Sequence, residues 1–274
     1  GSAPVFPMPA IDAPSSAALA TYVLLGAVMG VASVQVTRGV YAVEAAFERL
    51  PVHWMWWPAL GALAVGAAGY FEPRALGVGY DNIEHVLQGH VVARALAVLC
   101  AMKLVAWTLS LGSGTSGGTL APLFTIGGGL GALLGMGIAA AFPALGVDPR
   151  VAALVGMAAM FAGASRALLA SVVFAFETTR QPMGLLPLLG GCTAAYLVSC
   201  TMMRHSIMTR RIAERGVRVP EELSSDPLDR EPVGGRARRK PGPALQQEGR
   251  GPDLRRQGHG GHRQGPPPSS LRQR

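Results

Sequence analysis

Residues 104–141 read LVAWTLSLGSGTSGGTLAPLFTIGGGLGALLGMGIAAA, without a single charged side chain. Two apolar runs flank a polar loop of Gly, Ser and Thr at 112–122. An apolar run of about 20 residues is long enough to cross the hydrocarbon core of a bilayer as a helix. The stretch therefore predicts two membrane-spanning helices joined by an irregular polar loop.

The charge distribution extends this prediction to most of the chain. Residues 1–203 contain eight basic and eight acidic side chains, so the net charge of +8 lies entirely in 204–274. In ordinary soluble domains, about a quarter of the residues are charged. Further charge-free runs occupy 13–37, 50–71 and 181–203. We therefore predict an all-α polytopic membrane protein and exclude a soluble globular domain.

The hydrophobic runs and the Pro and Gly residues between them predict the element order. Residues 1–16 are expected to form an extended lead-in segment, and long helices to follow it. The expected helices cover about 17–48, a second run ending at Phe71, 82–89, 91–111, 119–141, 151–163, 167–177 and 183–203. Gly26 and Gly30 in the first helix, and Gly127, Gly131 and Gly135 in a later one, are spaced for close helix packing.

The tryptophans allow two structural interpretations, and the cysteines favour one. Trp54, Trp56 and Trp57 lie next to His53, which suits either a membrane-interface belt or packing between helices. The cysteines Cys100, Cys192 and Cys200 lie inside apolar runs without paired spacing. We interpret them as small buried hydrophobic residues and expect neither a disulfide framework nor a metal site.

The loop at 112–122 is the candidate functional site. Its alternative interpretation is an ordinary surface loop between two spans. Gly117 and Gly118 leave the backbone uncovered just before a helix whose first turn includes Pro122. The free amides of Thr119 and Leu120 would then point outward from a helix N-terminus, where an anion is favoured. No carboxylate occurs in the loop, which disfavours a cation site, and neutral amides allow the anion to leave again.

Short helices and isolated charges mark further positions of interest. The pieces at 151–163 and 167–177 are too short to span a bilayer alone and resemble the broken helices of transporters, or a simple amphipathic hairpin. Lys103, Arg166 and Glu177 lie inside or beside apolar runs. Such residues act as relay groups or, more commonly, as structural partners at an interface.

These residues resemble the CLC family of chloride channels and proton-coupled chloride exchangers. The stretch GSGTSGGTLAP at 112–122 is similar to the family signature GSGxSGGxFxP. PRALGVGYDNI at 73–83 resembles the P…GxGYxxI loop, and Lys103 falls on the basic position before the signature. ASRALLASVVFAFET at 164–178 resembles the SRAPLTxxxxxFExT element, and 206–216 resembles the SIYTxKLxxxG helix.

The resemblance implies a fold, a substrate and a set of site residues. It implies a fold of tilted and broken helices built from two inverted repeats, of which this chain carries the second, over 17–219. It also implies a homodimer with one pore in each subunit, in which the subunits contact each other through 167–177 and 183–203. It implies chloride as the transported ion and no cofactor. The anion contacts are expected at Gly117, Gly118, Thr119, Leu120, Ala121 and Pro122, with Met208 replacing a tyrosine, and the loop is completed by Gly112, Ser113, Gly114 and Ser116.

Motifs of the family's first half, GSGIP and GxEGP, are not found in the chain. This gives two functional hypotheses: half of a chloride-transporting pore, or a membrane fragment that needs a separate first half and does not transport alone. The chain also begins with Gly-Ser rather than Met, from which we expect a fragment or a processed product. We find no nucleophile–base pair or phosphate-binding loop, and we do not expect an enzyme.

The last part of the chain differs sharply in composition. Residues 220–274 are rich in Arg, Gly and Pro, and no aromatic residue follows Tyr196. Such composition predicts a disordered tail, which we interpret as truncated or frame-shifted. The lack of interleaved aromatic residues disfavours nucleic-acid binding. Five arginines follow the last span, which places the C-terminus in the cytoplasm by the positive-inside tendency: Arg204, Arg210, Arg211, Arg215 and Arg218.

Overall fold

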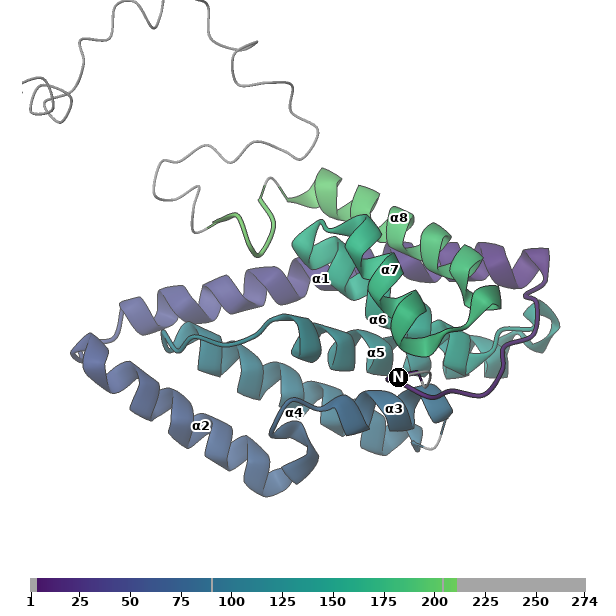
Figure 1. Ribbon diagram of the computed structural model, residues 1–274. Helices are drawn as coiled ribbons and strands as arrows, with labels where there is room; N and C mark the ends of the chain where they lie inside the picture. Colours follow the sequence, from purple (N-terminus) through teal and green to yellow (C-terminus); the bar gives the residue numbers. More distant parts are fainter. Residues whose placement is uncertain (1–3, 90, 204, 211–274) are drawn as a thin grey trace, which may run out of the picture. The chain divides into compact units, whose positions relative to one another are not determined.

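A computed structural model describes residues 4–89, 91–203 and 205–210, and over these residues the regular elements are helices (Figure 1). The α-helices are α1 (Ser16–Glu48), α2 (Trp57–Phe71), α3 (Tyr80–Gln88), α4 (Ala93–Gly112), α5 (Leu120–Ala141), α6 (Pro149–Ser165), α7 (Leu168–Thr179) and α8 (Leu185–Met202). Short 3₁₀ helices are η1 (Trp54–Trp56), η2 (Pro73–Ala75), η3 (Pro143–Leu145) and η4 (Pro182–Gly184). The all-α prediction is confirmed. The tail predicted at 220–274 lies outside the described residues.

Four described helical segments are long and apolar enough to cross a membrane: Ser16–Glu48, Ala93–Gly112, Leu120–Ala141 and Pro182–Met202. The helices α6 and α7 are shorter, as the sequence predicts. They are separated at Arg166, which ends α6 with a φ of 63° in the left-handed region. The chain therefore combines full-length spans with one broken pair of helices.

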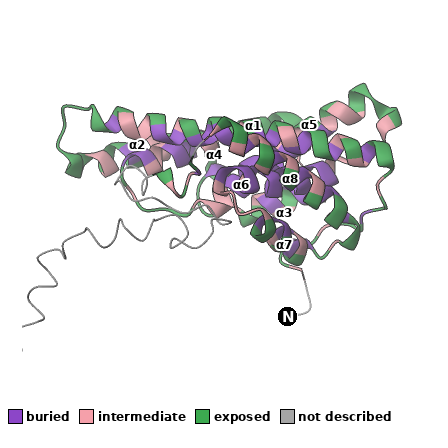
Figure 2. Ribbon diagram, turned by 90° about the horizontal axis from the view of Figure 1, so that it is seen from above, coloured by how far each residue is buried: buried purple, intermediate pink, exposed green. Residues whose placement is uncertain are grey.

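The helix α6 lies at the centre of the packing. Ten consecutive residues, 151–160, are all buried, and α6 contacts α1, α5, α7 and α8. Figure 2 shows the buried residues gathered where these helices meet. Because one helix is enclosed on all sides, its apolar sequence has no polar face.

The glycine spacings confirm two predicted contacts between helices. A Cβ atom on Gly127 of α5 would lie 2.6 Å from the carbonyl oxygen of Gly156 in α6. In the same way, a Cβ atom on Gly30 of α1 would lie 2.8 Å from the carbonyl oxygen of Ala195 in α8. Real side chains cannot approach a backbone this closely, so these glycines set the distance between the helices.

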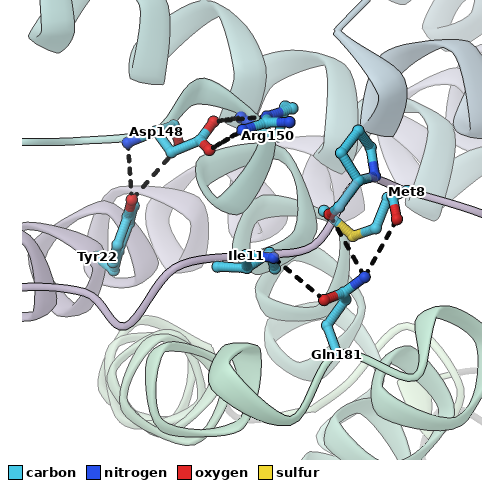
Figure 3. Close-up of polar contacts among 7 residues, drawn as sticks. Met8, Ile11, Tyr22, Asp148, Arg150 and Gln181 are labelled. Atoms are coloured by element: carbon cyan, nitrogen blue, oxygen red, sulfur yellow. Dashed lines mark hydrogen bonds and ion pairs between the residues drawn. The ribbon is translucent and has the colours of Figure 1, made fainter.

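The described N-terminal segment, residues 4–15, has no regular secondary structure and is bonded to the helices. The side-chain amide of Gln181 accepts from the Ile11 N–H at 3.3 Å and donates to the Met8 carbonyl oxygen at 3.2 Å (Figure 3). Phe6 is buried, and its N–H donates to the carbonyl oxygen of Thr178. The segment therefore follows a fixed path across the end of α7.

A second polar cluster joins α1 to the start of α6. The hydroxyl of Tyr22 accepts from the N–H of Asp148 at 2.9 Å, and the Asp148 carboxylate caps α6 through the N–H of Arg150 (Figure 3). The Arg150 guanidinium forms an ion pair with the same carboxylate at 2.7 Å. These bonds satisfy the N-terminal groups of α6, which a helix cannot satisfy by itself.

Candidate functional site

The predicted signature loop connects α4 and α5. The helix α4 ends at Gly112, and Ser113, which is buried, caps it while donating from its hydroxyl to the Ser110 carbonyl oxygen at 2.7 Å. Gly114 has a φ of 82°, the left-handed conformation that glycine adopts without steric cost. The Thr115 hydroxyl also donates to the Ser110 carbonyl oxygen. The first half of the loop is thus folded back onto the end of α4.

The second half of the loop leads into the N-terminus of α5. Thr119 is the N-cap residue, and its carbonyl oxygen accepts from the N–H of Leu123 at 3.2 Å. The first N–H groups of any helix have no acceptor within that helix. Among the described residues, the N–H groups of Thr119, Leu120 and Ala121 have no acceptor elsewhere either. Together with the helix dipole, they form a partly positive patch suited to an anion.

Trp107 is a site residue that the sequence analysis missed. Its indole Nε1–H on α4 donates to the carbonyl oxygen of Gly118 at 3.3 Å. In a planar trans peptide, the C=O of one residue and the N–H of the next point in opposite directions. The bond from Trp107 therefore turns the N–H of Thr119 away from α4. A single Trp in an apolar run carries no spacing signal that would have marked it.

The two central glycines lie at an open surface. A Cβ atom on Gly118 would meet nothing within 4 Å, and one on Gly117 would meet only a Leu111 methyl group at 3.6 Å. Ser116 is also exposed. Packing within this chain therefore does not require glycine at these positions. The backbone at Gly117 and Gly118 is therefore open to the surroundings of this chain.

The second motif, at 73–83, is brought against α4 and α5 by Lys103. The buried Lys103 ammonium donates to the carbonyl oxygens of Ala75 at 3.0 Å and Gly77 at 2.7 Å. Gly79, with a φ of 89°, passes so close that a Cβ atom would lie 3.3 Å from Lys103 Nζ and 3.2 Å from the Thr125 hydroxyl oxygen of α5. The buried ammonium therefore lies close to the second turn of α5.

The other two isolated charges have different surroundings. Arg166 donates from its guanidinium to the Met203 carbonyl oxygen, which agrees with the structural interpretation. Glu177 is exposed on α7. The helices α7 and α8, which the resemblance assigns to a dimer interface, expose Leu169, Leu186 and Leu197. That assignment stays a prediction.

Met208 lies in a turn after α8 and has an exposed fraction of 46%. Its N–H donates to the Ser206 hydroxyl at 3.3 Å, and the neighbouring Ile207 N–H donates to the carbonyl oxygen of Ala164 at the end of α6. No hydrogen bond between described residues joins Met208 to the loop at 112–122. Its expected place beside the anion stays a prediction.

Comparison with known proteins identifies relatives across most of the chain. A family model described as "Voltage gated chloride channel" matches residues 1–200. The putative chloride channel protein ClcB-like of Ralstonia nicotianae is 31% identical over 213 residues, which cover 78% of this chain and 50% of that protein. The chloride channel protein CLC-f of Arabidopsis thaliana is 36% identical over 213 residues, covering 72% of this chain and 27% of that protein.

Solved structures share the same fold. A slow cyanobacterial Cl⁻/H⁺ antiporter superimposes with a TM-score of 0.69 at 24% identity, over 79% of this chain and 51% of that one. A eukaryotic CLC transporter superimposes with a TM-score of 0.63 at 28% identity, over 75% of this chain and 36% of that one. The chain thus spans about half the length of such relatives or less. On its helices, its signature loop and a match that reaches from residue 1 to 200, the protein is an integral membrane protein of the voltage-gated chloride channel family.

Proposed function

We propose that this chain forms part of a chloride pathway, with the anion held by main-chain N–H groups at the start of α5. The observation that carries the proposal is the set of amides of Thr119, Leu120 and Ala121, which have no acceptor among the described residues and follow the exposed Gly117 and Gly118. The expected contacts at Pro122 and Met208 belong to the same proposal, although Pro122 has no N–H to donate.

The electrostatics of the region favour an anion. Residues 104–147 contain no acidic side chain that would repel chloride. The α5 dipole places about half a positive elementary charge at its N-terminus. The Lys103 ammonium is bonded to two neutral carbonyl groups, and no described carboxylate lies within salt-bridge distance of it. Its charge therefore adds to a positive potential near the first turns of α5.

Transport also requires that the anion leaves its site. Neutral amides bind an anion without the strong attraction of a fixed ion pair, which suits repeated entry and release. Relatives of this chain include an H⁺/Cl⁻ exchange transporter of Salmonella typhimurium, 29% identical over 175 residues. Chloride transport by the complete protein is the function that these features support best.

A matched pair of variants at Leu120 tests the proposal. Leu120 is the first residue of α5, so proline there removes no intrahelical hydrogen bond, but it disfavours the αR backbone of Thr119 and thereby disturbs both amides of the proposed site. Leu120→Pro removes the N–H, whereas Leu120→Ala shortens the side chain and keeps it. We expect chloride efflux from liposomes containing the purified chain to fall about tenfold in Leu120→Pro, as for the loss of a hydrogen bond to a charged group.

Leu120→Ala is the control, and we expect it to retain most of the chloride efflux of the unmodified chain. Thermal unfolding of both variants checks that each is folded. If Leu120→Pro and Leu120→Ala transport equally well, the N–H of Leu120 is not an anion contact. If the unmodified chain gives no efflux, the second function applies: a fragment that transports only together with a separate first half, which its coverage of 50% of the Ralstonia relative favours.

A further inference from the structure

The turn that carries Met208 is fastened to the rest of the chain by one tyrosine of α1. The hydroxyl of Tyr41 donates to the carbonyl oxygen of Ile207 at 2.7 Å. The guanidinium carbon of Arg210 lies 4.1 Å from the centre of the same tyrosine ring, within the range of a cation–π interaction. Tyr41 thus contacts the chain on both sides of Met208. Its own side chain is 8% exposed and is fixed by the surrounding helix packing.

Other bonds hold the same segment from the opposite direction. The N–H of Ile207 donates to the carbonyl oxygen of Ala164 at 3.0 Å, and Arg166 donates to the carbonyl oxygen of Met203. Arg38, also on α1, donates to the carbonyl oxygen of Met202 at 3.2 Å. The backbone on the N-terminal side of Met208 is therefore bonded both to α1 and to the junction between α6 and α7.

The turn itself is closed by its own hydroxyl groups. Ser206 is buried, and its hydroxyl accepts from the N–H of Met208 at 3.3 Å. The N–H of Ser206 donates to the Thr209 hydroxyl at 3.0 Å. Because the turn is internally bonded, its position depends on a few contacts with the helices, and among these Tyr41 reaches both Ile207 and Arg210.

We infer that Tyr41 is a positioning residue: it sets the place of the 206–210 turn, and through the turn the place of Met208 relative to the transported anion. The part of this inference that concerns the anion rests on the proposed function. The part that concerns the turn does not, because it follows from the contacts of Tyr41 alone. The experiment therefore has two readouts, one for each part.

The first readout is the accessibility of a cysteine placed at 208. Met208→Cys is made together with Cys200→Ser, because Cys100 and Cys192 are buried whereas Cys200 is half-buried. The rate of modification by a charged, water-soluble thiol reagent is then measured in detergent. Tyr41→Phe removes the hydroxyl donor and keeps the ring. Residue 208 is exposed with the turn in place, so its reactivity reports on its surroundings, and we expect the rate to change at least about twofold when the turn shifts.

Tyr22→Phe is the matched control. Tyr22 also lies on α1, is buried, and bonds through its hydroxyl to the backbone of Asp148, at the start of α6. Its loss should leave the modification rate at 208 unchanged. An unchanged rate in Tyr41→Phe, or an equal change in both variants, would overturn the positioning role. Arg210→Lys should leave the rate as it is and Arg210→Gln change it, because only lysine retains a cation over the ring.

The second readout is the ratio of chloride to nitrate efflux from liposomes. We expect Tyr41→Phe to change this ratio at least about twofold while Tyr22→Phe leaves it as it is. A ratio that stays constant in Tyr41→Phe, when accessibility has changed, overturns the link between the turn and the anion. If the unmodified chain shows no efflux but the accessibility pattern holds, the positioning of the turn stands, and the chloride-to-nitrate ratio is measured after reconstitution with a separate first half.

Discussion

The contact between Trp107 and Gly118 shows how one side chain outside the signature loop controls the direction of an amide within it. The indole donates to the carbonyl oxygen of Gly118, and the planar peptide fixes the N–H of Thr119 on the opposite side. The sequence predicted the loop and its free amides from the Gly117–Gly118 pair. It could not predict which side chain orients them, because that depends on how α4 and α5 pack.

We predict that Trp107→Phe weakens chloride binding about fivefold while the protein stays folded. Phenylalanine keeps most of the aromatic packing of this buried side chain but cannot donate a hydrogen bond to Gly118. Isothermal titration of the purified protein with chloride measures the effect. Tyr22→Phe is the control, since it also removes one hydrogen bond and keeps the ring, but at the start of α6 and not at the loop. Equal affinities in the two variants would show that the indole does not orient the site.

The packing of α5 against α6 is the part of the fold that the sequence predicted best among the helix contacts. Glycines at four-residue spacing indicated a smooth face on α5, and the structure places α6 against it. The spacing could not identify α6 as the partner, because any helix with small residues would fit such a face. Gly156 of α6 completes the contact, and no pattern in its own helix marked it.

We predict that Gly131→Leu prevents folding, whereas Gly137→Ala on the same helix is tolerated. A Cβ atom on Gly131 would collide with the backbone of Ala152, while one on Gly137 meets nothing within 4 Å. Backbone atoms cannot move aside as a flexible side chain can. Expression followed by size-exclusion chromatography in detergent provides the measurement. A monodisperse peak for Gly131→Leu at the position of the unmodified chain would contradict the packing described.

The helix α2 is the element whose surroundings the sequence left open. The tryptophans at its start have different surroundings. Trp54 and Trp56 of η1 are 64% and 63% exposed, whereas the indole of Trp57 donates to the carbonyl oxygen of Val52 and its ring lies 6.5 Å from that of Phe47. At the other end of α2, Tyr70 and Phe71 are exposed as well. Packing between helices is therefore observed for Trp57, and the interface interpretation stays a prediction for Trp54 and Trp56.

We predict that Trp54 and Trp56 lie at a membrane interface. The stretch 54–71 is helical apart from its first turn, and at about 1.5 Å per residue it is close to the thickness of the hydrocarbon core. In liposomes, the fluorescence of a variant retaining only these two tryptophans should be quenched more by lipids labelled near the headgroup than by lipids labelled at the chain end. Stronger quenching by the deep label would place them inside the hydrocarbon instead.

At the scale of the whole molecule, the chain covers 50% of the Ralstonia protein and 51% of the cyanobacterial antiporter chain. The motifs at 73–83 and 112–122 are both bonded to α4, through Lys103 and Trp107. A Cβ atom on Gly118 would meet nothing within 4 Å. The family and the helices could be predicted from the sequence. The contacts of Lys103 and Trp107 could not, because they depend on how the loops pack against α4.

We predict that a first half carrying the GSGIP and GxEGP motifs, taken from a relative and added to this chain during reconstitution, raises chloride efflux at least about tenfold over the chain alone. The reason is that protein groups on only one side of the anion cannot replace all of the water molecules that the anion loses when it enters the pore. The same first half combined with Leu120→Pro provides the control. Full efflux from the chain alone, with no gain on addition, would show that this half is sufficient.

The hydrogen bonds that fix the segment at and after the end of α8 affect which substitutions the protein tolerates there. The bonds from Arg38, Tyr41, Ala164 and Arg166 all end on main-chain atoms of this segment, which are the same whatever side chain a position carries. Substitutions at Met202 and Met203 can therefore accumulate without displacing the segment, whereas Ser206 closes the turn through its own hydroxyl. A methionine at 208 alters which atoms face the solvent, while the route of the chain is inherited from α1 and the end of α6.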